Sequence, residues 1–349
     1  MYKFTKEFNF NNQNHMSIRY FFFLFLIISN YSFSIQDNDY FMTVLGPKPI
    51  SEMGIALTHE HILVDFIGAE QTGTHRWKRD SVVNRALPFL ENAKSLGLRT
   101  FFEASPTYQG RDPVVIKTIA EKSRLNILVS TGYYGADDAK YLPKHAYTES
   151  AQELANRWIN EFKNGIDGST IKPGFIKISV HPKSLDDIHK KLTKAAALTH
   201  LETGLTITSH TGPSIPAFEQ MDIIENNGVS LNAFVWVHAQ FERDKEKLIE
   251  AAKRDTWISL DGINERNSEQ YLSLIKYLKD KGYLHKVLLS QDSGWYTVGQ
   301  KNGGNYKGYT TIFNTLIPLL KQNKFTDEDI NTLLVKNPAK AFSIRKQAK

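Results

Sequence analysis

The chain of 349 residues contains no cysteine. Disulfide bridges, thiolate metal sites and a cysteine nucleophile are therefore excluded. The absence does not identify the compartment, because a secreted protein need not contain disulfides.

The N-terminal part lacks a hydrophobic run long enough to span a membrane comfortably. Residues 20–28 (YFFFLFLII) are apolar, Arg19 precedes them, and small residues surround a cleavage point at residues 32–34 (Ser-Phe-Ser). This pattern is typical of a signal peptide. We therefore predict a signal peptide over residues 1–34 and an exported protein, periplasmic or secreted, with one domain over residues 35–349.

Two alternatives at the N-terminus remain open. Translation starts at Met1 or at Met16, which would give a shorter charged region before the apolar run. An uncleaved membrane anchor is the alternative to a signal peptide, and the absence of cysteine near the cleavage point excludes a lipoprotein anchor.

The sequence has no cluster of charges of one sign. Its formal net charge is +6, but lysines and arginines alternate with acidic residues, as in EKLIEAAKRD. This is the pattern of a solvated surface, so nucleic-acid binding is not expected.

Strand-like and helix-like segments alternate after residue 40, without an internal repeat or a domain linker. A glycine-rich phosphate loop, expected of an open doubly wound sheet, is absent. Eight strands with intervening helices predict a closed parallel (β/α)8 TIM barrel. The predicted strands are residues 55–58, 98–103, 126–131, 174–179, 205–209, 232–237, 257–260 and 286–290. The predicted helices include residues 82–96, 114–123, 151–164, 185–202, 245–253 and 269–281.

Four histidines lie at the ends of predicted strands. His59 and His61 close the first strand, and residues two apart in a strand point to the same face. His210 and His238 close the fifth and sixth strands. Each histidine alone could be a core residue, but barrel enzymes place their chemistry at the carboxyl ends of the strands, so the four together predict a metal site.

The remaining histidines are less informative. His181 follows the fourth strand and is undecided. The others lie in loops or lysine-rich helical stretches and are interpreted as surface residues: His75, His145, His189, His200 and His285.

Two further residues belong with the four histidines. Asp292 follows the eighth strand and is the natural carboxylate of the set. Lys177 lies inside the apolar strand GFIKISV, where an unpaired ammonium is costly. One interpretation is a salt-bridged or snorkelling lysine. The other is carbamylation, which would turn the amine into an anionic ligand that bridges two metal ions.

The order of these motifs resembles the phosphotriesterase-like branch of the amidohydrolase superfamily. The resemblance is carried from about residue 42 to 344 by GIALTHEHILVDF, GRD, TGYY, GFIKIS, TITSHTG, WVHAQ, SLD, LSQDSGW and LLVKNPAKAF. It implies two divalent metal ions, usually zinc, bridged by a hydroxide and by N6-carboxylysine at Lys177. By the same resemblance His59, His61 and Asp292 would hold the buried ion, and His210 and His238 the exposed one.

The resemblance also suggests catalytic roles. Asp292 would accept a proton from the hydroxide, and Asp261 would relay it or fix His238. Tyr133 or Tyr134 could orient the substrate oxygen. Trp295 would form part of an apolar wall.

The sequence departs from the family pattern at two places. Glu103 ends the second strand, where it could be an acid that supports the site or a pocket group. Gly262 and Ile263 follow Asp261, where hydrolases of long-chain acyl-lactones tend to carry arginine and an aromatic residue, so the resemblance to those enzymes is incomplete. The loop after the eighth strand is rich in Gly, Tyr and Lys, which favours a polar substrate.

We therefore predict a zinc-dependent hydrolase of a lactone or a related carboxylic or phosphoric ester, with phosphotriester hydrolysis as a side activity. The alternative is an exported ligand-binding protein of the same fold without turnover. A structural metalloprotein is disfavoured, because structural sites are compact in sequence. The expected partner is a small-molecule ester, with no stable membrane anchor, and relatives suggest a homodimer.

Overall fold

A computed structural model describes residues 39–344. The predicted signal peptide lies outside these residues and stays a prediction. Within the described range, no helix is both long and apolar enough to cross a membrane.

Eight parallel strands form one sheet whose order follows the sequence, β3-β5-β6-β7-β8-β9-β10-β11. The two outermost strands lie next to each other: the His59 N–H donates to Ser290 Oγ at 2.7 Å, and the Asp292 N–H donates to the His59 carbonyl at 3.2 Å. The sheet is thereby nearly closed into a barrel, which confirms the predicted fold class. The strands are β3 (Ala56–Glu60), β5 (Thr100–Glu103), β6 (Asn126–Thr131), β7 (Phe175–Ser179), β8 (Ile207–His210), β9 (Phe234–Val237), β10 (Trp257–Leu260) and β11 (Val287–Leu289).

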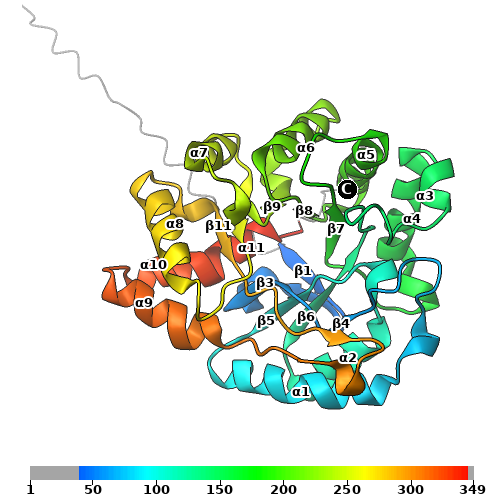
Figure 1. The fold of residues 1–349 in the computed structure, drawn as a ribbon, viewed down its shortest axis with the longest axis horizontal. Coiled ribbons are helices and arrows are strands. Elements are labelled where there is room, and N and C mark those ends of the chain that lie inside the picture. Colours follow the sequence, from blue (N-terminus) through cyan, green and yellow to red (C-terminus); the bar gives the residue numbers. More distant parts are fainter. Residues whose placement is uncertain (1–38, 345–349) are drawn as a thin grey trace, which may run out of the picture. The chain divides into compact units, whose positions relative to one another are not determined.

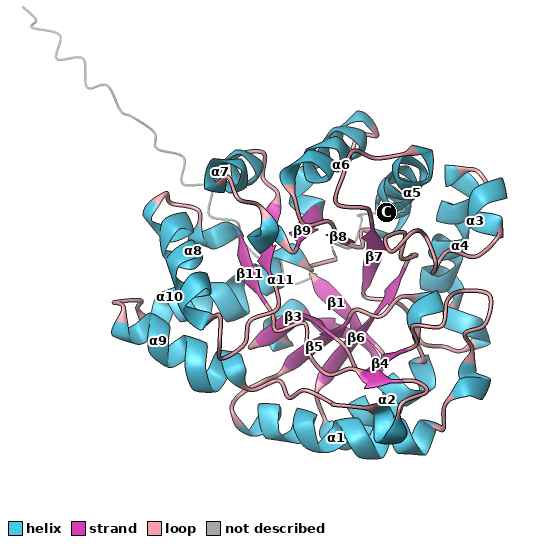
Figure 2. Ribbon diagram, viewed as in Figure 1, coloured by secondary structure: helices cyan, strands magenta, loops and turns pink. Residues whose placement is uncertain are grey.

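Helices surround the strands (Figures 1 and 2). Each predicted helix is present, because its apolar residues recur at helical spacing and pack on the sheet. The helices that connect the strands are α1 (Arg79–Ser95), α2 (Pro113–Ser123), α3 (His145–Thr148), α4 (Ala151–Asn164), α5 (Asp187–Thr203), α6 (Ser214–Asn226), α7 (Lys245–Lys253) and α8 (Ser268–Asp280). After β11 follow α9 (Ile317–Gln322), α10 (Asp327–Asn331) and α11 (Asn337–Ala341), with π-helical turns at Ile312–Leu316 and Thr332–Lys336.

Two small strand pairs were not predicted. β1 (Tyr40–Thr43) and β2 (Gly46–Pro49) form an antiparallel hairpin, and β4 (Leu63–Val64) pairs with β12 (Tyr296–Thr297). The second pair links the loop after β3 to the loop after β11. It therefore joins the two segments that carry His61 and Asp292.

An apolar cluster fills the amino-terminal half of the barrel. We call it the floor cluster; its largest members are Phe41, Phe102, Phe175, Trp257, Leu288 and Phe342. The Phe342 ring lies 4.4 Å from that of Phe102 and 6.2 Å from that of Phe175. The backbones of Tyr40 and Ile344 pair beside it. The floor is thus sealed by residues from both ends of the described chain, and chemistry is confined to the opposite end.

Candidate metal centre

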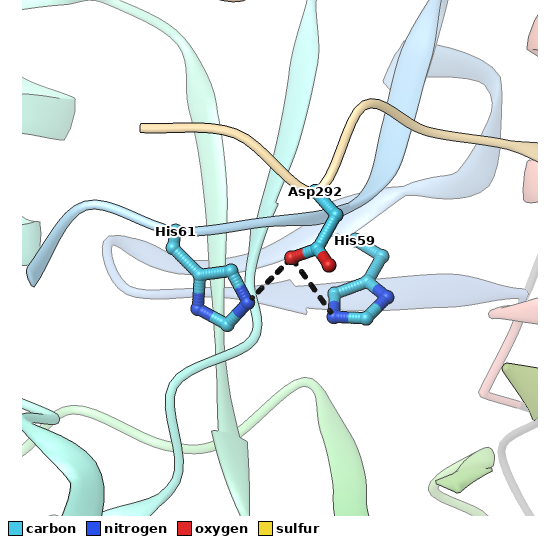
Figure 3. A group of neighbouring side chains, drawn as sticks. All are labelled: His59, His61 and Asp292. Carbon is cyan, nitrogen blue, oxygen red and sulfur yellow. Dashed lines mark ion pairs between the residues drawn. The ribbon is translucent and has the colours of Figure 1, made fainter. Parts of the chain in front are cut away.

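The end of β3 presents two imidazoles on one side and a carboxylate on the other. His59 lies in β3 and His61 directly follows it, and both side chains turn toward Asp292 (Figure 3). The intervening Glu60 points away, where its carboxylate accepts the N–H groups of Gln291 at 2.7 Å and Ser293 at 2.8 Å. Glu60 therefore fastens the loop after β11, which positions Asp292.

Asp292 lies at the centre of the group. Its Oδ1 is 3.1 Å from His61 Nε2 and 3.8 Å from His59 Nε2, and its Oδ2 is 3.9 Å from His238 Nε2. Burial alone would raise the pKa of Asp292, but His59 and His61 hold it well below its ordinary value. Oδ1 is buried without a hydrogen-bond partner among the described residues. An orphaned carboxylate oxygen facing imidazole nitrogens is the arrangement expected of a metal ligand.

Lys177 points into the same group from β7. Its side chain is buried, and Nζ lies 3.2 Å from His59 Nε2. Within residues 39–344, no carboxylate lies within ion-pair distance of this amine. Burial lowers the pKa of Lys177 to about 8, and burial together with Lys177 lowers the pKa of His59 to about 4. The salt-bridged interpretation of Lys177 therefore has no partner in the described part of the chain.

His210 and His238 complete the ring of imidazoles. His210 is the last residue of β8, and His238 follows β9 in the left-handed region at φ 61°. Their ring centroids are 4.4 Å apart, and His238 lies 5.1 Å from His59. Burial lowers the pKa of both histidines. Both rings are therefore neutral near pH 7, which leaves nitrogen lone pairs for a metal.

Asp261 lies behind two of these imidazoles. Its Oδ1 is 3.5 Å from His59 Nδ1, and its Oδ2 is 3.8 Å from His238 Nδ1. The carboxylate also accepts the His238 N–H at 2.9 Å and the Ser259 hydroxyl at 2.8 Å. At His59 the carboxylate favours the tautomer with the proton on Nδ1, which leaves Nε2 free for a metal. Asp261 therefore acts on the ring of His59 and on the backbone of His238.

Ser105 and Glu103 hold the imidazole of His61 from behind. The sequence singled out Glu103 but not Ser105. The Ser105 hydroxyl is 2.9 Å from His61 Nδ1 and donates to Glu103 Oε1 at 2.6 Å. Burial raises the pKa of Glu103 to about 7. Glu103 had been recognised as an unusual residue at a strand end. Ser105 follows it by two positions, and this spacing is the signal that could have revealed the pair.

The two candidate tyrosines point in different directions. The Tyr134 hydroxyl lies 3.4 Å from His210 Nδ1. The Tyr133 hydroxyl lies 3.0 Å from His145 Nε2, and its ring packs against Trp158. The structure thus brings Tyr134 to the group and directs the Tyr133 hydroxyl away from it.

Trp295 lies beside the group. Its ring lies 4.4 Å from that of His61 and stacks on Phe66 at 5.6 Å. Its indole N–H donates to the Asp292 carbonyl at 2.8 Å. The same residue therefore shapes the apolar side of the site and holds the loop that carries Asp292.

The set fits divalent metal ions. His59, His61 and Asp292 each offer a ligand atom within 4.8 Å of the others. His59, His238 and Asp261 meet the same criterion, but there the carboxylate faces Nδ1 of both rings and supports them from behind. Nitrogen and oxygen ligands without thiolates suit zinc and similar borderline ions.

One interpretation of the other histidines is wrong. His75 and His285 are exposed as expected, but His189 is fully buried at the start of α5. The neighbouring Lys190 and Lys191 had suggested a surface. The missed signal is helical spacing, because the buried residues Leu192 and Thr193 lie three and four positions later.

Known proteins share this arrangement of sequence and fold. Residues 39–342 match the family model described as the phosphotriesterase family. The chain is 28% identical to the phosphotriesterase homology protein of Escherichia coli (strain K12), across 83% of this chain and 98% of that protein. It is 27% identical to the aryldialkylphosphatase of Saccharolobus solfataricus, across 84% and 96%. It is 26% identical to the phospho-furanose lactonase of Mycoplasmopsis synoviae (strain 53), across 88% and 93%. The crystal structure of the Escherichia coli phosphotriesterase homology protein, complexed with phosphate in the active site, superposes with a TM-score of 0.71 at 26% identity, across 83% of this chain and 99% of that one.

Proposed function

Because this chain belongs to the phosphotriesterase family of metal-dependent hydrolases, we propose that it hydrolyses a lactone or a related carboxylic or phosphoric ester with two zinc ions. The observation that carries the proposal is the convergence of His59, His61, Lys177 and Asp292 at one end of the barrel. His210 and His238 lie beside them.

The residues that would hold the ions are those that the family resemblance implies. His59, His61 and Asp292 would hold one ion, and His210 and His238 the other, with carbamylated Lys177 between them. Bound divalent ions would supply Lewis acidity, which activates water near neutral pH and polarises a carbonyl or phosphoryl oxygen.

The side chains of this protein supply the remaining steps. Asp292 is ionised, because the neighbouring imidazoles hold its pKa well below the ordinary value, so a carboxylate oxygen can accept a proton. With 22% of its side chain exposed, Asp292 can pass that proton to solvent. Asp261 holds the His59 imidazole and the His238 backbone, and Trp295 limits access of water on one side.

The proposal for Lys177 rests on its burial and on the absence of a carboxylate partner in the described residues. A pKa of about 8 leaves a useful fraction of neutral amine at pH 7.5. The amine nitrogen would form a bond to carbon dioxide and lose a proton, which yields a carbamate with one negative charge. That charge would offset part of the charge of two dications.

A lactone is preferred over a phosphotriester as the natural substrate, because natural phosphotriesters are scarce. The lactonase among the relatives supports this preference, and the aryldialkylphosphatase supports phosphotriester hydrolysis as a side activity. The loop after β11 carries Gly, Tyr and Lys residues, which favours a polar or sugar lactone over a long acyl chain.

The test is acid release by zinc-loaded protein, reconstituted with bicarbonate, from aliphatic lactones, sugar lactones and one aryl phosphotriester. Faster turnover of a lactone would support the proposal and narrow the substrate. Faster turnover of the phosphotriester would reverse the preference. Two bound ions without activity on the panel would place the substrate outside these classes, and no bound metal would favour a ligand-binding protein.

The bridging role of Lys177 has a separate test. We expect Lys177→Ala to lower the zinc bound per chain by at least one ion, measured by elemental analysis after dialysis. Lys286→Ala is the matched control, because Lys286 is also buried but pairs with Asp255, and it should leave the count unchanged. An unchanged count in Lys177→Ala would exclude the carbamate bridge.

A further inference from the structure

We propose that His181, Asp186 and His189 form a second metal site, for a borderline divalent ion of the zinc class. The site lies in the connection from β7 to α5 and shares no residue with the centre at the barrel mouth. The proposal does not depend on the proposed hydrolase function.

The three side chains come from one short segment: His181 precedes α5, Asp186 is the N-cap of this helix, and His189 lies in its first turn. Each offers one ligand atom, and these atoms lie within 4.8 Å of one another. The rings of His181 and His189 are 4.4 Å apart at an interplanar angle of 72°. His189 is fully buried, His181 is partly exposed, and 52% of the Asp186 side chain is exposed. An ion could therefore reach the group from solvent and meet a buried ligand.

The hydrogen bonds of His189 leave one nitrogen available. Its Nε2 lies 3.0 Å from the Gly135 carbonyl, which can only accept, so Nε2 carries a proton. In a neutral ring, Nδ1 then presents a lone pair. This Nδ1 lies 2.7 Å from Asp186 Oδ1, yet it has no partner of hydrogen-bond geometry among the described residues. A lone pair and a carboxylate oxygen at this distance repel each other unless a proton or a metal ion is shared by both atoms.

The carboxylate is held in place independently of any ion. Asp186 is the N-cap of α5, and its Oδ1 accepts the His189 backbone N–H at 3.1 Å. The Asp186 carboxylate is therefore positioned before any ion binds. Two ligands of a tetrahedral zinc ion, with bonds of roughly 2.0–2.2 Å, lie roughly 3.3–3.6 Å apart, so His189 Nδ1 and Asp186 Oδ1, which are 2.7 Å apart, must separate by less than about 1 Å to bind one ion.

The surroundings are rigid, which favours a preformed site. A Cβ atom at Gly135 would come 2.8 Å from the Ser179 carbonyl and 2.7 Å from Leu192 Cδ1, so the chain after Tyr134 packs directly on β7 and α5. The Ala136 N–H also donates to Ser179 Oγ at 2.8 Å. The carbonyl that orients His189 cannot move freely, and it orients the ligand as a hydrogen-bond acceptor commonly orients a metal-binding imidazole.

The competing explanation is a proton on Nδ1, which would make His189 an imidazolium paired with Asp186. Two conservative variants separate the explanations. His189→Gln can keep a donor toward the Gly135 carbonyl but removes the Nδ1 ligand. Asp186→Asn keeps a good N-cap and removes the anionic ligand. His200→Gln, on the same helix, is the matched control, because His200 faces the Leu205 carbonyl and lies outside the group.

Crystals loaded with Zn²⁺ and measured at the zinc absorption edge would locate the ion. We expect anomalous density within roughly 2.0–2.2 Å of the three ligand atoms in the wild type, and its loss in His189→Gln and Asp186→Asn. Density at the mouth with none at this group would overturn the proposal. Density at this group with none at the mouth would support it and contradict the hydrolase centre.

A solution count excludes binding at crystal concentration only. Elemental analysis after equilibrium with micromolar Zn²⁺ should give one ion fewer per chain in His189→Gln and Asp186→Asn than in the wild type and His200→Gln. Equal counts in all four proteins would overturn the proposal. Turnover at the mouth should be retained in the two variants, because neither residue belongs to that centre.

Discussion

At its amino end, β7 contributes Phe175 to the floor cluster, whereas two residues later the same strand contributes Lys177 to the mouth. The same change occurs from β11 to the loop after it, where Leu288 of the strand lies in the floor cluster and Asp292 of the loop lies in the group of imidazoles.

Both ends are buried, but burial has opposite consequences. Apolar side chains at the floor stabilise the fold by roughly 1.5–3 kcal/mol each. At the mouth, burial shifts the pKa of Lys177 to about 8 and of Glu103 to about 7, which disfavours their charged forms. The comparison indicates that burial at the floor stabilises the fold, whereas burial at the mouth costs stability and prepares side chains for reaction. Variants at each end can test this division of roles.

The largest effect is expected from Asp292→Asn at the mouth. The amide is a poor proton acceptor and a weaker metal ligand, so the turnover number should fall by about 10²–10⁴-fold. Cooperative unfolding should be retained, because the floor is untouched. Turnover would be measured with the best substrate of the panel, beside thermal unfolding followed by circular dichroism. Turnover within tenfold of the wild type would exclude the proton-transfer role.

Phe342→Ala at the floor should lower stability and leave turnover unchanged, the reverse of the result expected at the mouth. Its ring packs on Phe102 and Phe175, so its removal should lower the free energy of unfolding by about 3–5 kcal/mol. Turnover per folded molecule should be unchanged. Phe241→Ala is the control of equal size beside His238, since Phe241 is 67% exposed and its loss should cost less than about 0.5 kcal/mol. Urea unfolding measures both, and similar losses in the two variants would refute the division between the ends.

A smaller, pH-dependent effect is expected from Glu103→Gln. Burial raises the pKa of Glu103 from 4.5 to about 7, so between these values the folded protein holds a proton that the unfolded chain has released. The free energy of unfolding therefore falls as pH rises through this window, by at most roughly 3 kcal/mol from this group. In metal-free protein, Glu103→Gln should remove that part of the slope.

The control for this measurement is Glu202→Gln, because 59% of the Glu202 side chain is exposed. Urea unfolding between pH 4.5 and 7.5 should give parallel curves for Glu202→Gln and the wild type. If the free energy of unfolding of Glu103→Gln also changed with pH in parallel with the wild type, Glu103 would titrate normally. Burial of this group at the mouth would then cost less stability than we infer.

The sequence predicted most of the fold because a parallel barrel repeats one simple pattern. Short apolar strands and amphipathic helices alternate, and the carboxyl ends of the strands must meet at one end. That topology is sufficient to bring His59, His210 and Asp292 together in the prediction. It also explains why residues at strand ends were easier to identify than residues in the connections.

The features that were missed depend on side-chain direction or on pairing too short to leave a pattern. The pairing of β4 with β12 involves only two residues on each strand. His189 is next to two lysines in sequence, but its own direction is inward. The different directions of Tyr133 and Tyr134 depend on how one loop turns, which adjacent positions in a sequence do not reveal.

The smallest expected effect concerns these two tyrosines. If His210 binds metal through Nε2, its Nδ1 carries the proton and donates to the Tyr134 hydroxyl at 3.4 Å, which leaves the phenol proton free to donate to a substrate oxygen. Burial raises the pKa of Tyr134 above its ordinary value, so this donor stays protonated. Tyr134→Phe should therefore lower kcat/KM by about 3–10-fold, equivalent to roughly 1 kcal/mol, with little change in unfolding.

Tyr133→Phe is the matched control: its hydroxyl lies at His145, so it should lower stability by about 1 kcal/mol and leave kcat/KM within twofold. If the two variants exchanged these outcomes, Tyr133 would be the substrate-orienting residue, and the loop after β6 would have to turn differently when substrate binds.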